Sequence, residues 1–158
     1  MPRIDDPSWD ADGLAGLSVR MLTADDLTFH YFTSDVVISD GCNEVPLRTP
    51  GLPVVDFVLM LVQLCREVVS SGESVVESSQ TQDSITAMRA GDVVELSYSF
   101  SGLVSTISLR DLKEAPSRAL QSALEVLFSA HDDLRFNRYL IELVDLVRAG
   151  PDELPGGS

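Results

Sequence analysis

Apolar and polar residues alternate most cleanly over residues 93–100. Val94, Leu96, Tyr98 and Phe100 share one face, and Glu95, Ser97 and Ser99 the other. This period of two is typical of a strand that has one buried face and one wet face. Three more β-prone segments lie nearby at spacings of roughly ten residues, separated by turn formers: residues 74–79, 85–89 and 103–107. The pattern predicts a four-stranded antiparallel meander with one wet face.

A long apolar segment precedes this meander and predicts a helix over residues 53–69. Pro53 suits the first helical turn, and Asp56 suits the positive end of the helix dipole. Gly72 then supplies a C-terminal stop. Because the segment is apolar on nearly all sides, we expect the helix to lie across the sheet at the centre of the core.

Two flanking regions complete the predicted fold. Residues 27–32 are aromatic and β-prone and, with residues 36–38, predict a hairpin or a pair of adjacent strands; an earlier strand is predicted over 17–22. After the meander, Ser108 and Asp111 predict a helix start, Pro116 a kink or restart, and residues 134–148 a final helix. The order predicts an α+β fold: an antiparallel meander sheet, a buried central helix and two C-terminal helices.

The composition of the chain, and the placing of its Pro and Gly residues, divide it into three parts. Residues 1–13 are acidic and interrupted by Pro and Gly, which predicts a flexible arm; residues 14–150 form one domain, and residues 151–158 a disordered tail. Trp9 lies in the arm. It is either an anchor for a partner or, as we favour, a side chain that docks back onto its own domain.

The charge of the chain limits the classes of partner that it can bind. Among 158 residues, 25 are acidic and 11 are Lys or Arg, which gives a net charge of −14 on a chain that is 44% hydrophobic. That composition indicates a folded protein with an acidic coat, which repels nucleic acid. The first residues lack the apolar region of a signal peptide and no apolar run is long enough to cross a bilayer, so we expect a cytoplasmic protein with no membrane contact.

Residues that could carry catalysis are scattered. Two cysteines and two histidines lack metal-ligand spacing, so we expect no metal, no cofactor and no catalytic residue. Cys65 is expected to be a buried thiol, His30 a half-exposed strand residue and His131 a capping residue. No serine stands in a G-x-S-x-G turn, and no Gly-rich loop has a phosphate-binding pattern.

The remaining candidate function is binding through acidic residues. Acids concentrate in the first part of the chain, where they form either a coat that confers solubility or a docking face for a basic protein. The predicted partner-binding residues are the acids Asp25, Asp26, Asp35, Asp40 and Glu44, with Trp9 and Tyr31 as anchors.

Three segments carry a resemblance to short actinobacterial proteins that have no assigned activity. They are Phe29-His30-Tyr31-Phe32 with Asp35-Val36-Val37, the helix start Pro53-Val54-Val55-Asp56-Phe57, and the hairpin with Ile85, Gly91-Asp92 and Glu95, within residues 27–110. More loosely, the acidic α+β chain is similar to bacterial immunity proteins, which neutralise toxins.

The predicted function is therefore an immunity-type inhibitor or adaptor that docks a basic partner, for example a toxin. Two alternatives stay open. One is a small-molecule binder or unrecognised enzyme with a pocket between the sheet and the helix that begins at Pro53; the other is a structural subunit of a larger assembly. The oligomeric state is not predicted.

Overall fold

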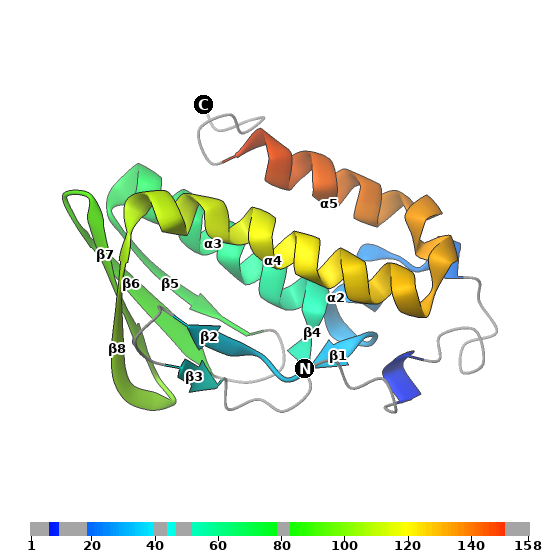
Figure 1. Cartoon of the computed structure of the whole chain (residues 1–158), viewed down its shortest axis with the longest axis horizontal. Helices are drawn as coiled ribbons and strands as arrows, with labels where there is room; N and C mark the ends of the chain where they lie inside the picture. The colour runs from blue at the N-terminus through cyan, green and yellow to red at the C-terminus, as the bar shows by residue number, and fades with distance from the viewer. Residues whose placement is uncertain (1–6, 10–18, 40–43, 47–51, 79–82, 151–158) are drawn as a thin grey trace.

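The computed structural model describes residues 7–9, 19–39, 44–46, 52–78 and 83–150, and it has an α+β fold (Figure 1). Its main sheet is antiparallel with the order β5-β6-β7-β8. The strands are β5 (Glu73–Glu77), β6 (Ser84–Ala90), β7 (Val93–Tyr98) and β8 (Ser101–Ser108). The predicted meander is confirmed, and its ends differ from the prediction by at most a few residues.

The predicted central helix is α3 (Val54–Ser71), which packs on one face of this sheet (Figure 1). Pro53 stands at its N-cap, and Gly72 ends it with φ of 84°, a left-handed conformation that glycine adopts without steric cost. Val58, Leu64 and Val68 are each at most 1% exposed, so the apolar pattern is explained by burial against both the sheet and other helices.

After β8 the chain continues into α4 (Leu109–Ala130), whose first turn is capped by the Ser108 hydroxyl, as predicted. Pro116 does not restart the helix, contrary to one of the two expectations. It lies buried within a continuous helix, since the loss of one N–H bond is offset by packing of the ring.

The last helix begins later than predicted. Residues Asp132–Phe136 form a 3₁₀ turn, η3, and α5 runs over Arg138–Ala149. The Asn137 side chain accepts a hydrogen bond from the Leu140 backbone N–H at 3.1 Å and so fixes the helix start.

The prediction of strands over 27–32 is wrong. Residues Ala24–Phe29 form helix α2, and residues Val19–Met21 form a 3₁₀ turn, η2, in place of the strand expected over 17–22. The physical reason is a capping box: the Thr23 hydroxyl accepts from the Asp26 backbone N–H, and the Asp26 carboxylate accepts from the Thr23 N–H. This local pairing outweighs the β propensity of the aromatic residues.

Short strands connect α2 to α3. β1 (Thr33–Ser34) pairs with β4 (Leu52–Pro53), and β2 (Val37–Ser39) pairs with β3 (Glu44–Pro46), both antiparallel. Of the two adjacent strands expected over 27–32 and 36–38, only the second therefore has a counterpart, β2. It pairs with β3 and not with a strand over 27–32.

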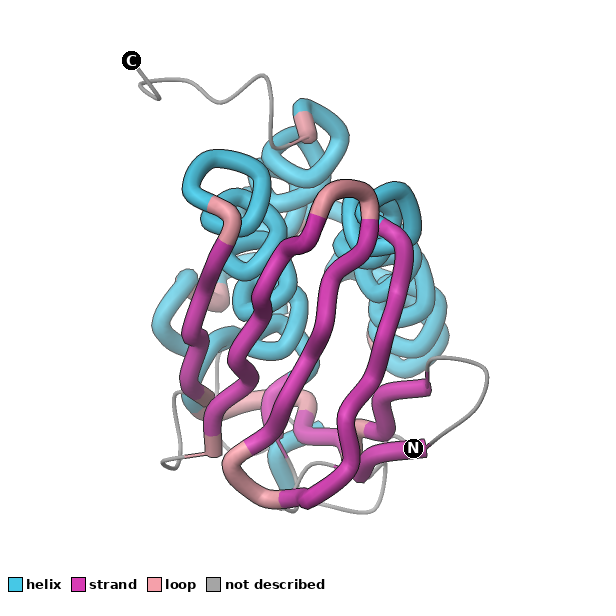
Figure 2. Tube along the Cα trace, turned by 90° about the vertical axis from the view of Figure 1, so that its left-hand side faces the viewer, coloured by secondary structure: helices cyan, strands magenta, loops and turns pink. Residues whose placement is uncertain are grey.

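All of the helices lie on the same side of the main sheet. In Figure 2 the four strands face the viewer and the helices are behind them. Two apolar clusters fill the space behind: one joins the sheet to α3 and the start of α4, and the other joins α3, α4, α5 and the N-terminal elements. Within the part of the chain that the structure describes, no helix covers the opposite face of the sheet (Figure 2).

Candidate protein-binding face

The uncovered face of the main sheet is formed by every second residue of β5–β8. In β5, Ser74 and Val76 are buried while Glu73, Val75 and Glu77 are exposed, which fixes which residues point outward. The strand pairing aligns these residues in rows across the sheet. Val75 lies opposite Thr86, Thr86 opposite Ser97, and Ser97 opposite Val104.

A second row places two acids around an apolar side chain. Glu73 pairs with Met88 and Met88 pairs with Glu95. Since neighbouring strands are about 4.8 Å apart, the two glutamates stand roughly 10 Å apart on either side of Met88. The third acid of this face, Glu77, is four residues further along β5 than Glu73 and pairs with Ser84.

The charge of this face is of one sign. Among the described residues, Glu73, Glu77 and Glu95 make no ion pair with any cation. The single cationic residue of the four strands, Arg89, belongs to the other set of alternating positions, and its Nε donates to the Gly91 carbonyl at 2.8 Å. The outward positions therefore hold three carboxylates and no cation.

Apolar side chains accompany these acids. Val75 is 57% exposed and Met88 51%, and Val93 and Val104 are each more than two-fifths exposed. Ser and Thr hydroxyls occupy most of the other outward positions: Ser84, Thr86, Ser97, Thr106 and Ser108. Exposed apolar side chains therefore stand among the acids and hydroxyls of this face.

The acids predicted from the sequence do not form one surface. Asp25 and Asp26 are in the first turn of α2, whereas Glu44 begins β3, which is far from α2 in Figure 1. Asp35 is exposed between β1 and β2, and Asp40 lies outside the described residues. Asp26 has a local role, because its carboxylate caps α2.

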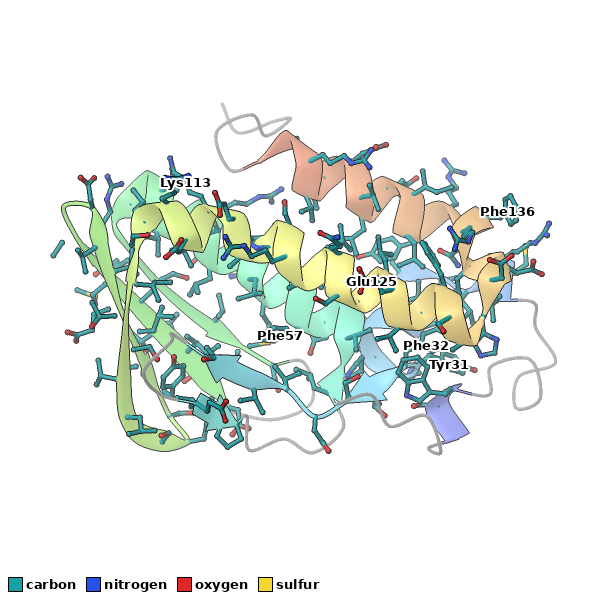
Figure 3. The ribbon with its side chains drawn as sticks, in the orientation of Figure 1. Tyr31, Phe32, Phe57, Lys113, Glu125 and Phe136 are labelled. Atoms are coloured by element: carbon teal, nitrogen blue, oxygen red, sulfur yellow. The ribbon has the colours of Figure 1, made fainter. Side chains whose placement is uncertain are left out.

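The two predicted anchors are both held by packing against other residues of this chain. Trp9 is only 4% exposed, and its Nε1 donates to the Thr33 carbonyl at 2.9 Å, so it docks onto its own domain. Tyr31 is half-buried beside Phe32 at the start of β1, where Figure 3 shows both rings together. The other described arm residues, Pro7 and Ser8, form a 3₁₀ turn with Trp9, η1 (Pro7–Trp9); the rest of the arm and residues 151–158 lie outside the described part.

The residues considered for catalysis remain apart. Cys65 is buried and forms no disulfide with another described residue, and Cys42 is outside the described residues. His30 is exposed at the end of α2 instead of on a strand, and a ring nitrogen of His131 hydrogen-bonds with the Trp9 carbonyl. Within the described ranges, no cluster of three His, Cys, Asp or Glu residues could hold a metal ion.

Sequence reasoning identified the wet face of the meander but not its charge distribution. Acids are dense along the sequence within residues 25–44, and this density favoured that region. Glu73, Glu77 and Glu95 are spread along the sequence and come together only through strand register. A usable signal was present in the alternation Glu73, Val75, Glu77, which has no cation at the outward positions.

No protein-family model matches this chain, and neither a curated protein nor a solved structure matches it. Among the described residues, no helix combines the length and the apolar character needed to cross a membrane.

Proposed function

We propose that this protein is an acidic protein-binding module that docks a basic partner protein on the uncovered face of β5–β8. The observation that carries the proposal is the set of outward positions with three carboxylates, four exposed apolar side chains and no cation. The predicted class of function is kept, while the docking surface moves from residues 25–44 to the sheet.

Charge supports a basic partner and opposes several others. A surface of one sign attracts the opposite charge, which speeds association, and it repels the phosphates of nucleic acid. Two copies of this chain meeting through this face would place carboxylates against carboxylates with no cation between them. The face therefore favours a basic protein over self-association, which also weighs against the alternative of a structural subunit assembled through it.

The row Glu73–Met88–Glu95 supports a specific contact beyond charge attraction. Met88 is flexible and polarizable and can adapt to an apolar side chain of a partner. The glutamates on either side would pair with Lys or Arg residues set about 10 Å apart, twice the strand spacing. Apolar contacts at the centre with charged pairs around them are the usual anatomy of a protein interface.

The partner class follows from the same chemistry. A basic toxin or another basic protein in the cytoplasm fits this face, and the similarity to immunity proteins favours an inhibitor. An adaptor that holds a basic protein has the same surface requirement. The two are distinguished by whether binding abolishes an activity of the partner.

The test compares two sets of charge reversals as baits in a lysate of the host. The first set, on the sheet, is Glu73→Lys, Glu77→Lys and Glu95→Lys. The second, among the acids predicted from the sequence, is Asp25→Lys, Asp35→Lys and Glu44→Lys. Both sets change the net charge equally, and all six side chains are exposed. Captured proteins are eluted in steps of rising salt and identified by mass spectrometry.

We expect one basic protein on the wild-type bait and on the second set, and its loss from the sheet set. Its dissociation constant for each purified variant then measures the effect. Retention by the sheet set with loss from the second set would restore the surface predicted from the sequence. Equal loss from both would indicate attraction by net charge alone, and no basic protein on the wild type would overturn the proposal.

A further inference from the structure

The outer edge of strand β5 is open. β5 is the first strand in the order of the main sheet, and in Figure 2 it is the leftmost of the four long strands. Within the described part of the chain, β6 is the one strand that pairs with it. An edge strand presents a row of backbone N–H and C=O groups, which can pair with a strand of another chain.

The register of β5 shows which residues present these groups. The Arg89 N–H of β6 donates to the carbonyl of Gly72, directly before β5, at 2.8 Å. In an antiparallel ladder, residues bonded to the neighbouring strand alternate with residues whose backbone groups point the other way. The even-numbered residues of β5 are therefore bonded to β6, and the N–H and C=O groups of Glu73, Val75 and Glu77 point to the outer edge.

Other described residues use little of this hydrogen-bonding capacity. The Ser71 hydroxyl donates to the Glu73 carbonyl at 3.1 Å, and a carbonyl oxygen has a second acceptor site. Among the described residues, no backbone hydrogen bond connects the edge groups of Val75 and Glu77 with another element. These two residues can therefore offer two donors and two acceptors to an added strand.

The side chains of the same three residues set the charge of the edge. Glu73, Val75 and Glu77 are all exposed, and they point to the uncovered face of the sheet. Two carboxylates thus flank an apolar group on one strand, roughly 14 Å apart at about 3.4 Å per residue. Like charges opposite each other on paired strands are destabilising, so the β5 edges of two copies of this chain repel each other. A strand with cations at the facing positions is attracted instead.

We infer that the basic partner docks an extended segment along β5, as a fifth, antiparallel strand of the sheet. This inference rests on the proposed function, which supplies the basic character of the partner. In such a strand, the residues opposite Glu77, Val75 and Glu73 are two positions apart and face the same side. The segment therefore has Lys or Arg at its first and fifth positions and an apolar residue at its third. Backbone pairing supplies affinity, and the alternate side chains supply specificity.

The test uses synthetic peptides, so the partner need not be identified first. The matched peptide is acetylated and amidated, and its core, Lys-Thr-Val-Thr-Lys, has two Thr residues on either side. An isomer with the core Thr-Lys-Val-Lys-Thr has the same composition and charge, but it cannot place both Lys residues opposite glutamates. NMR titration of the isotope-labelled full chain at low salt measures each dissociation constant. Because cross-strand charge pairs stabilise a sheet, we expect the isomer to bind roughly fivefold more weakly.

N-methylation of the peptide separates strand addition from attraction by charge. On the central Val of the matched peptide, it removes the N–H that donates to the Val75 carbonyl, and it should weaken binding at least roughly fivefold. On the Thr directly before this Val, the N–H points away from β5, so methylation there should leave the dissociation constant within about twofold. Equal effects of the two methyl groups, or no binding of the matched peptide, would overturn the inference.

Variants of the protein locate the peptide. Glu73→Gln and Glu77→Gln should each weaken binding of the matched peptide roughly two- to fivefold. Glu125→Gln removes the same charge from an exposed position on α4, behind the sheet, and should not change the binding. Equal weakening by all three variants would indicate attraction by net charge alone and contradict the inference. If the Val75 and Glu77 amide signals shift with protein concentration in the absence of peptide, a second copy occupies the edge, which also overturns it.

The outcomes for this edge and for the proposed function can be told apart. The capture experiment can retain a basic protein that the charge reversals on the sheet release, while the chain binds the matched peptide and its isomer equally. The partner then docks on the face alone, and only the inference about the edge fails. If the capture experiment retains no basic protein, both fail.

Discussion

The indole of Trp9 packs edge-on against the ring of Phe32, with ring centroids 5.2 Å apart and planes inclined by 67°. Phe32 is fully buried and has φ of 61°, a left-handed conformation that is unfavourable for a bulky residue. Two backbone bonds hold it: its N–H donates to the Ser8 carbonyl, and its carbonyl accepts from the Val54 N–H. The segment around Trp9 thus holds the strained turn between α2 and β1.

Trp9→Ala should therefore lower the free energy of unfolding by about 3–5 kcal/mol, the usual cost of removing a buried Trp. Trp9→Phe, which keeps apolar volume and loses the hydrogen bond to Thr33, should cost less. Urea unfolding measures both. Trp9 is the only tryptophan, so wild-type emission should also be blue-shifted and protected from acrylamide. If the native protein instead shows the emission of a water-exposed indole, Trp9 is free to contact a partner.

Asn137 is a second link between distant parts of the chain. It is fully buried, and its Nδ2 donates to the carbonyls of Val19 and Leu22 at 2.9 Å each, while its Oδ1 caps α5. Asn137→Ala should lower the free energy of unfolding by about 3 kcal/mol, because it removes a cap and leaves two carbonyls without this donor.

Ser108→Ala is the matched control, since Ser108 is exposed and caps α4 with no such tertiary bonds. It should cost about 1 kcal/mol, the typical value of a cap. Urea denaturation gives both numbers. If the two substitutions cost the same, the bonds from Asn137 to the N-terminal segment contribute nothing.

The elements of the fold that could be predicted are those determined by residues close together in the sequence. The meander follows from alternation, and α3 from a long apolar run between Pro53 and Gly72, so both appear in the sequence and in the structure. Helix α2 was missed because the aromatic composition of residues 27–32 favours strand, while its start depends on a reciprocal bond between Thr23 and Asp26. A capping residue directly before a short helix competes with β propensity, and here it prevails.

The candidate face was only partly predictable for a different reason. Alternation shows that Glu95 points to solvent, but that Glu73 and Glu95 flank Met88 depends on the register of three strands. The burial of Trp9 likewise depends on contacts with Phe32 and His131, which are 23 and 122 positions away in the sequence. Such long-range pairings leave no periodic trace in the sequence.

Asp25 and Asp26 are adjacent in the sequence, but only the Asp26 carboxylate has a structural role. The Asp26 carboxylate accepts the Thr23 N–H at 2.9 Å, whereas Asp25 is exposed in the same helical turn. Asp26→Ala should therefore lower the free energy of unfolding by about 1 kcal/mol, and Asp25→Ala by a few tenths at most. Thermal and urea unfolding of the two variants measure the difference. Equal stabilities would mean that the capping box does not hold α2.

Tyr139 gives the protein a dependence of stability on alkaline pH. Burial raises the pKa of the Tyr139 phenol above its ordinary value of 10.0, a hydrogen bond with the Thr28 side chain opposes this, and the negative charge of Glu142 adds to the rise. Below about pH 9 the phenol is protonated in both states, so it contributes no pH dependence. Above that pH the unfolded chain loses this proton first, and stability falls until the folded phenol ionises too.

Tyr139→Phe should remove this contribution. The wild type should lose stability faster than the variant between about pH 9 and about pH 11, with a slope difference of at most about 1.4 kcal/mol per pH unit. Glu142→Gln should reduce the slope without removing it, because burial remains the larger cause. Urea unfolding at stepped pH measures all three proteins. Since other ionisable groups are common to wild type and Tyr139→Phe, parallel curves for these two would show that the phenol ionises alike in the folded and unfolded chains.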